Sequence, residues 1–202
     1  MFDIGANEGQ TTRILLDHVD GCVVHAVEPF PDPYRELHRG YGTHPRVVLH
    51  ELALSDSSGR IDVPYRAASR YTHSLSTSTN LARGANDCGQ VEIRTDTLDN
   101  LCRAQEIERI EFLKIDVEGH EMAVLRGGES MLQGRRVDSI LAEATFDRSS
   151  RTHTPFRDLD DHLHARGFQV AGIHHRVALV PSRPKWGSYC DVLWLHRDLF
   201  PT

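Results

Sequence analysis

The sequence predicts an α/β fold with a mostly parallel, twisted sheet, helices on both faces and an antiparallel last strand. Three observations lead to this prediction. Helix and strand patterns alternate along the chain. A glycine-punctuated turn follows the first apolar residues, and an acidic cluster follows a later apolar run. Alternation of this kind is typical of parallel sheets with helices on both faces, whose ligands bind beyond the carboxyl ends of the strands.

Each element is indicated by its own local pattern. Apolar runs predict strands at residues 22–27, 47–51, 110–115, 139–142, 168–173 and 191–195. Helical periodicity predicts helices at residues 11–17, 33–39, 98–105, 120–125 and 155–166.

Helix ends are indicated by capping residues. Thr11 or Thr12 is expected to cap the first helix and Thr97 the third. Gly40 is expected to end the second helix and Gly167 the last. Apolar residues also alternate with polar ones at Ile61, Val63, Tyr65, Val91 and Ile93, which predicts a half-exposed antiparallel excursion from the main sheet.

Size and composition favour one soluble domain over residues 1–202. The net charge of −6 argues against a nucleic-acid partner. No apolar run is long enough to span a bilayer and no secretory signal is visible, so we expect a cytoplasmic protein. The cysteines (Cys22, Cys88, Cys102 and Cys190) form no C-x-x-C pair and are expected to be reduced.

Two segments stand out by their length. The first strand has little room before Asp3, so we expect it to be very short or to lack upstream residues. The polar stretch 66–90 is long enough to be a lid or binding loop.

The opening turn has the composition of a nucleotide-binding loop. Gly5 and Gly9 permit a tight turn, and Asn7 tolerates a left-handed conformation. Glu28 follows the second predicted strand, where α/β folds place a carboxylate that binds ribose. Asp3 would repel a pyrophosphate, so its presence favours a cationic ligand.

A second dense motif follows the apolar run 110–115. Asp116 stands at the carboxyl end of this predicted strand, and Glu118, His120 and Glu121 follow within five residues. Crowded titratable groups acquire shifted pKa values or bind a cation. The competing interpretation is structural: Glu118 favours the helix N-terminus, and Glu121 is simply solvated.

These motifs together resemble the FkbM family of S-adenosylmethionine-dependent methyltransferases, which are typically O-methyltransferases. The resemblance rests on D-I-G-A-N-E-G at 3–9, V-E-P at 27–29, A-L-S-D at 53–56, T-L-D at 97–99, K-I-D-V-E-G-H-E at 114–121 and V-L-R-G at 124–127. It implies a Rossmann-like class I methyltransferase fold.

The resemblance also implies site residues. Cofactor-binding residues would be Asp3, Gly5, Asn7, Gly9, Glu28, Leu54, Ser55 and Ser74, with Ala53 beside the adenine. Asp116, and after it His120, is the expected base that removes the proton of the acceptor hydroxyl. Asp116 and Glu143 could share Mg²⁺, although a third ligand is not evident in the sequence.

The remaining histidines are weaker candidates. His162 and His164 point to different faces of a helix, and His174 and His175 are expected at the surface. His153, in the loop after Glu143, could reach a substrate.

The expected acceptor is a hydroxyl of a small molecule, a sugar or a lipid-linked glycan. A nicotinamide-dependent oxidoreductase shares the ribose carboxylate but requires G-x-G-x-x-G spacing, which this turn lacks. A catalytically inactive binding module with the same fold remains an alternative. The sequence does not indicate the oligomeric state.

Overall fold

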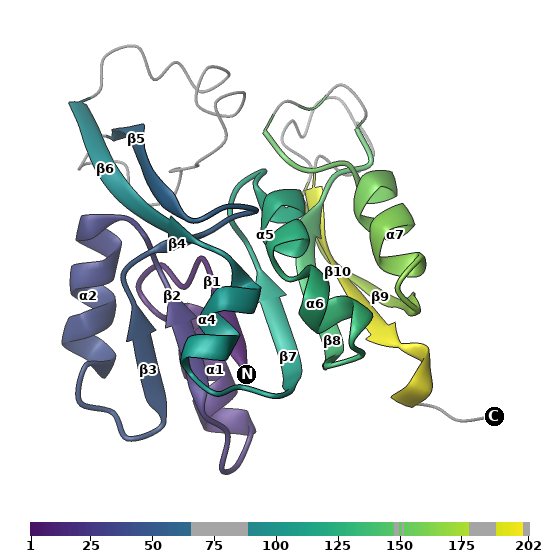
Figure 1. The fold of residues 1–202 in the computed structure, drawn as a ribbon, viewed down its shortest axis with the longest axis horizontal. Coiled ribbons are helices and arrows are strands. Elements are labelled where there is room, and N and C mark those ends of the chain that lie inside the picture. Colours follow the sequence, from purple (N-terminus) through teal and green to yellow (C-terminus); the bar gives the residue numbers. More distant parts are fainter. Residues whose placement is uncertain (66–88, 148–149, 151, 178–188, 200–202) are drawn as a thin grey trace.

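The main sheet of the protein is mostly parallel. The computed structural model describes residues 1–65, 89–147, 150, 152–177 and 189–199. Within them, seven strands form one sheet in the order β3-β2-β1-β7-β8-β10-β9 (Figure 1). The strands are β1 (Phe2–Ile4), β2 (Val24–Val27), β3 (Val47–His50), β7 (Ile110–Ile115), β8 (Val137–Ala144), β9 (Phe168–Val177) and β10 (Tyr189–His196).

Strand directions confirm the predicted architecture. β1 pairs in parallel with β2 and β7, β2 with β3, and β7 with β8. The last strand, β10, lies between β8 and β9 and runs antiparallel to both. The carboxyl ends of β1, β2, β7 and β8 therefore meet along one edge, which is where a ligand is expected to bind.

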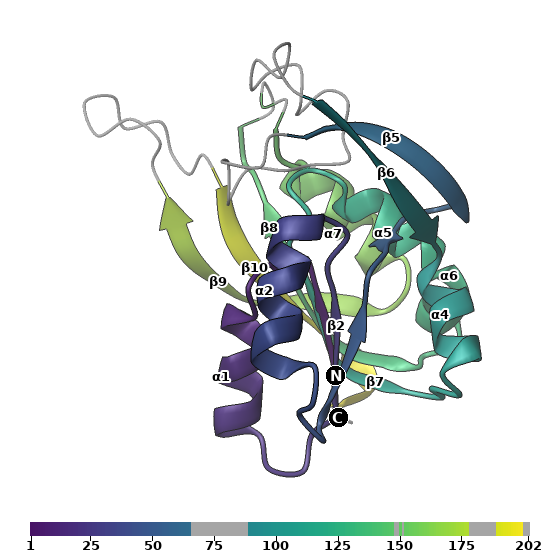
Figure 2. The same ribbon diagram turned by 90° about the vertical axis from the view of Figure 1, so that its left-hand side faces the viewer.

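Helices cover both faces of the sheet. Figure 2 shows α1 (Gln10–His18) and α2 (Pro31–Tyr41) on one face. On the other face lie α4 (Leu98–Ala104), α5 (Glu121–Gly127), α6 (Glu129–Gln133) and α7 (Phe156–His164). Strand residues contribute to a hydrophobic core on each face of the sheet. Phe2 and Ile4 of β1 belong to the large core under α4–α7, whereas Val24 and Ala26 of β2 pack under α1 and α2.

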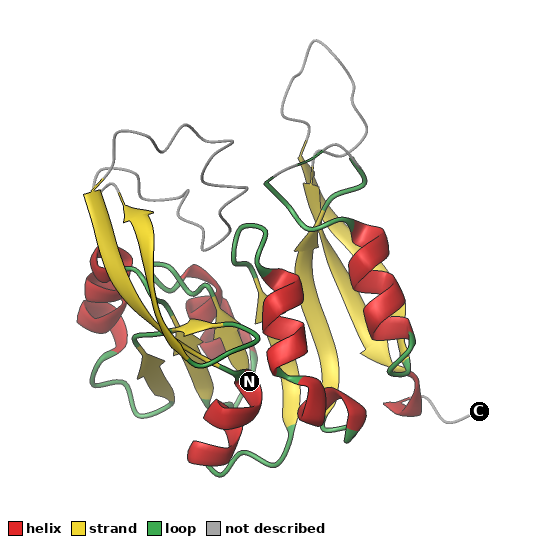
Figure 3. Cartoon of the chain, turned by 45° about the horizontal axis from the view of Figure 1, so that its top comes forward, coloured by secondary structure: helices red, strands yellow, loops and turns green. Residues whose placement is uncertain are grey.

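A small second sheet extends from the edge of the fold. It consists of β4 (Ala53–Leu54), β6 (Gly89–Asp96) and β5 (Gly59–Tyr65), in that order. β5 and β6 are antiparallel, with Ile61 opposite Ile93 and Val63 opposite Val91, so the predicted excursion is confirmed. The β5–β6 ribbon rises beyond the upper ends of β2 and β3 (Figures 1 and 3).

The predicted helix ends are wrong in three helices. α7 ends at His164 with Ala165 as its C-cap, before the expected Gly167. α1 begins at Gln10 with Gly9 as its N-cap, so neither threonine caps it. Thr12 is instead buried, and its hydroxyl binds Asp3. α2 continues through Gly40 to Tyr41, and its C-cap is Gly42.

The predicted cap at Thr97 is confirmed. The Thr97 side chain caps α4 by accepting a hydrogen bond from the backbone N–H of Asn100 at 3.1 Å. Cys22, Cys102 and Cys190 are buried, whereas Cys88 lies outside the described residues. Most of the expected loop 66–90, with Ser74, also lies outside them. Among the helices of the described segments, none is long and apolar enough to cross a membrane.

Candidate functional site

The opening turn is shaped by contacts within the protein. Gly5, Asn7 and Gly9 have φ values of 76°, 51° and 93°, so the predicted left-handed Asn7 is confirmed. A Cβ on Gly5 would lie 1.9 Å from the carbonyl oxygen of Asp116, which shows that the turn packs directly against the end of β7. Glycine at position 5 therefore joins the first and second sequence motifs at one place.

Glu28 lies where the sequence predicted it, directly after β2. Glu28 is buried, with 5% of its surface exposed to solvent. One carboxylate oxygen accepts a hydrogen bond from the backbone N–H of Asn7, and the other from that of Phe30, each at 2.9 Å. Burial raises the pKa of Glu28 to about 7, although these two hydrogen bonds oppose the shift. The carboxylate is thus held in one orientation at the ligand edge.

Asp3 has a different environment from the one expected. It is fully buried, and its carboxylate accepts a hydrogen bond from the Thr12 hydroxyl at 2.7 Å. The ammonium of Lys114 lies 3.3 Å from the other oxygen. The charge of Asp3 is therefore balanced inside the protein, and direct contact with a cationic ligand stays a prediction.

Lys114 is a central residue that sequence reasoning missed. Its ammonium donates to the carbonyl of Gly5 at 3.1 Å and lies 3.5 Å from Asp116. Burial alone would lower the pKa of Lys114, but the neighbouring carboxylates of Asp3 and Asp116 raise it above the ordinary value. The available signal was a lysine inside a buried apolar strand, which requires a partner.

Asp116 and His120 occupy the same edge. Asp116 follows β7, and its side chain is 44% exposed beside Lys114. His120 is the N-cap residue of α5, and its Nε2 lies 3.0 Å from the Ser55 hydroxyl. Burial lowers the pKa of His120, so the imidazole is neutral at pH 7. The structure thus brings a predicted catalytic residue next to a predicted cofactor residue.

The two neighbours of Ser55 are more enclosed. Leu54 is 1% exposed, and its side chain belongs to the main core. Ala53 is also buried and packs with residues of the β5–β6 ribbon. Their expected contacts with adenine stay a prediction.

Glu121 was wrongly expected to be solvated. It is fully buried and accepts hydrogen bonds from the backbone N–H groups of Val117 and Gly119, at 3.3 and 3.0 Å. The Thr154 hydroxyl also donates to it. Burial raises the pKa of Glu121 despite these bonds. Glu121 therefore ties the turn after β7 to the segment that precedes α7.

Glu143 lies at the carboxyl end of β8, as the predicted strand implied. The structure groups it with Glu118 and His153, whose potential ligand atoms lie within 4.8 Å of one another. Asp116, the expected partner of Glu143 in a metal site, is not a member of this group. His153 is thus close to the other candidate residues.

Among the described side chains, the other candidate histidines are not members of this group. His162 is half-buried beside Glu129, at 3.8 Å, whereas His164 is exposed. The two therefore face different surroundings, as predicted. His174 is exposed on β9, and the side chain of His175 is outside the described residues.

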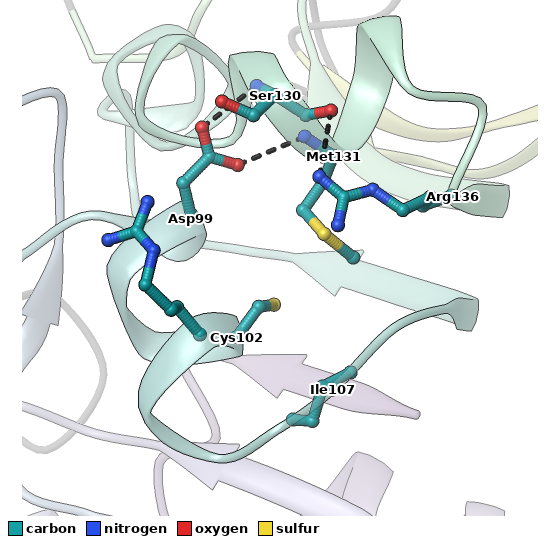
Figure 4. Close-up of a pocket in the computed structure, with 7 residues that line it drawn as sticks. Asp99, Cys102, Ile107, Ser130, Met131 and Arg136 are labelled. Carbon is teal, nitrogen blue, oxygen red and sulfur yellow. Dashed lines mark hydrogen bonds between the residues drawn. The ribbon is translucent and has the colours of Figure 1, made fainter.

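A small pocket of about 130 Å³ lies at the opposite edge, near the residues that precede β7 and β8 (Figure 4). Asp99 accepts hydrogen bonds there from the backbone N–H groups of Ser130 and Met131, at 2.8 and 3.0 Å. Arg136 donates to the Ser130 carbonyl. These contacts join α4 to α6, so we assign the pocket a packing role.

The comparison with known protein families identifies this fold and its motifs. Residues 3–170 match the Methyltransferase FkbM domain. The chain belongs to the FkbM methyltransferase family.

Two curated proteins are similar to this member of the FkbM family. The hexuronic acid methyltransferase AglP of Haloferax volcanii is 33% identical over 145 residues, covering 71% of this chain and 54% of AglP. The 2-O-methyltransferase NoeI of Sinorhizobium fredii is 27% identical, covering 67% of this chain and 60% of NoeI. The chain thus spans little more than half the length of these relatives.

Solved structures share the fold. A methyltransferase FkbM from Methylobacillus flagellatus KT superposes with a TM-score of 0.61 at 18% identity, covering 96% of this chain and 42% of that one. M. capricolum TrmK, in complex with S-adenosyl-homocysteine, has a TM-score of 0.50 at 10% identity, covering 96% and 61%. At these identities the similarity establishes the methyltransferase-like fold alone.

Proposed function

We propose that this FkbM-family chain is an S-adenosylmethionine-dependent O-methyltransferase that acts on a sugar hydroxyl. The observation that carries the proposal is the placement of Glu28. Its carboxylate is fixed at the carboxyl end of β2 by two backbone N–H groups, one of which belongs to the opening turn.

The residues at this edge fit the cofactor. A buried carboxylate with further acceptor capacity suits the two hydroxyls of a ribose, and hydrogen bonds to charged groups contribute roughly 1.5–3 kcal/mol. Asn7 and Gly9 would border the methionine part, and Ser55 the adenine. S-adenosylmethionine supplies an electrophilic methyl group when it is bound.

The proposed acceptor follows from the relatives. AglP is named for a hexuronic acid, which is a sugar, and NoeI for 2-O-methylation, which is transfer to an oxygen, so the two names taken together support a sugar hydroxyl. The chain's net charge of −6 also makes a nucleic acid a poor acceptor. We therefore favour a carbohydrate.

The chain's own residues would position the acceptor and remove its proton. Asp116 is the first candidate base, because its carboxylate is partly exposed at the end of β7. His120 is the second, because its imidazole is neutral at pH 7. Lys114 holds Asp116 and the opening turn at a fixed separation. Positioning of this kind supplies a large part of the rate in a displacement reaction.

Transfer of a labelled methyl group to hexuronic acid and neutral hexose glycosides tests the proposal. The site of methylation in the product is then located by NMR. We expect Asp116→Asn to lower kcat by about 10²–10⁴-fold while leaving the Kd of the cofactor nearly unchanged. The exposed Asp62 on β5 provides the matched control, Asp62→Asn, which should behave as the wild type.

Two outcomes would contradict the proposal. A folded sample that binds no S-adenosylmethionine by calorimetry excludes the cofactor. Tight cofactor binding without transfer to any hydroxylated acceptor favours the inactive binding module instead.

A further inference from the structure

Three side chains from separate segments converge beyond the end of the sheet. Glu118 lies in the turn after β7, Glu143 at the end of β8, and His153 in the segment before α7. One potential ligand atom of each lies within 4.8 Å of the other two. All three residues are at least partly buried.

Glu143 supplies an independent indication of a ligand. The residue is 9% exposed, and its Oε2 is buried without a hydrogen bond to any residue that the structure describes. His153 Nε2 lies 3.6 Å from this oxygen, which is beyond hydrogen-bonding distance but within the distance of an ion pair when the imidazole is protonated. Because buried carboxylates are normally hydrogen-bonded, paired or metal-bound, Oε2 requires an explanation.

His153 is held in one orientation. Its Nδ1 lies 2.8 Å from the Thr152 hydroxyl, and its ring stacks on Tyr189 with centroids 4.6 Å apart. The contact with Thr152 engages Nδ1 and directs Nε2 toward Glu143. Histidines that bind metals commonly use one ring nitrogen for the ion and the other for a hydrogen bond that fixes the ring.

Negative charge accumulates around this group. The carboxylates of Asp116, Glu118, Glu121 and Asp191 all act electrostatically on Glu143. Lys114, a buried cation nearby, already pairs with Asp3 and Asp116. A bound cation would offset this charge.

We propose that Glu118, Glu143 and His153 bind a divalent cation of the Mn²⁺ type at the acceptor side of the site. Two carboxylate oxygens and one imidazole nitrogen suit Mn²⁺ better than Mg²⁺, which prefers oxygen ligands alone. Three protein ligands leave coordination positions open. If the proposed sugar methylation holds, on which this role rests, neighbouring hydroxyls of the acceptor would occupy those positions.

Mn²⁺ binding to the purified, EDTA-treated chain tests the site without cofactor or acceptor. We expect the electron paramagnetic resonance signal of free Mn²⁺ to report one saturable equivalent. Glu143→Gln, Glu118→Gln and His153→Ala should each weaken binding at least about tenfold, because each removes a ligand. Glu108→Gln, at an exposed carboxylate before β7, should leave it unchanged. Circular dichroism verifies that each variant is folded, and any one folded ligand variant suffices.

The proposal is overturned if wild-type protein shows no saturable Mn²⁺ binding up to millimolar concentration. It is also overturned if the folded ligand variants bind Mn²⁺ as the wild type does. Binding without methyl transfer would leave the site standing and remove the proposed activity. Methyl transfer that survives EDTA in a protein without Mn²⁺ binding would do the reverse.

Discussion

Glu28 offers the sharpest test of the cofactor site, because its protonation changes close to neutral pH. Burial raises its pKa from 4.5 to about 7. Ribose hydroxyls donate hydrogen bonds best to an ionised carboxylate. Only the protein in which Glu28 is ionised should therefore bind the cofactor tightly. The apparent affinity for the cofactor should therefore be proportional to the fraction of protein molecules in which Glu28 is ionised.

The magnitude follows from this pKa. Glu28 would be about 10% ionised at pH 6 and about 90% at pH 8, so affinity should rise about tenfold between these values. In Glu28→Gln the rise should vanish. Affinity at pH 8 should also fall by about 10–150-fold, which corresponds to the loss of a charged acceptor, roughly 1.5–3 kcal/mol.

Calorimetric titration with S-adenosylhomocysteine at pH 6, 7 and 8 provides the assay. Glu51→Gln removes an exposed carboxylate just after β3 and serves as the matched control, so it should keep the wild-type profile. An affinity that is constant from pH 6 to 8, or an unchanged profile in folded Glu28→Gln, would refute the role of Glu28.

Glu28 also affects the free energy of unfolding, and this effect has the opposite pH dependence: its stabilising contribution falls as pH rises. Because the folded protein holds the Glu28 proton more tightly than the unfolded chain, this contribution is complete below pH 4.5 and is lost as pH rises through about 7. The shift corresponds to roughly 3 kcal/mol at most. Urea denaturation of wild type and Glu28→Gln at pH 4.5 and 7.5 would measure the difference, and equal pH dependence would contradict it.

Two further predictions concern the scaffold beneath the site. Gly5→Ala should destabilise the fold more than Gly21→Ala, because both residues have positive φ but only Gly5 would also clash with Asp116; the backbone strain alone costs about 1–2 kcal/mol. Equal midpoints in thermal unfolding would show that the turn does not pack against β7. Lys114→Met should cost about 3–5 kcal/mol in urea denaturation, because it leaves the buried carboxylate of Asp3 unpaired. Full stability of that variant would mean that Asp3 is not charged, and Asp3→Leu in the same background should recover part of any loss.

Local sequence patterns predicted the framework correctly. Apolar runs gave the strands, and the antiparallel last strand was confirmed. Positions at element ends were also correct: Asn7 is left-handed, Thr97 caps α4, and Glu28 follows β2. These features depend on dihedral preferences and on the spacing of apolar residues, which are properties of a few neighbouring residues.

Predictions failed where the adjacent sequence did not indicate the role of a side chain or the presence of a helix. Thr12 looked like a cap but binds Asp3, and Glu121 looked solvated but binds Thr154. The helix α6 was not predicted, because its five residues show too little periodicity to stand out. For Thr12 and Glu121, a tertiary contact decided what the side chain does.

The sequence by itself determined the class of fold and which residues reach the carboxyl edge of the sheet. The tertiary structure alone decided how their charges are matched. Lys114 neutralises Asp3 across 111 positions of the chain, and Glu118, Glu143 and His153 meet from three segments. Electrostatic interactions depend on distance and burial in space, and neither quantity can be read from separation along the chain.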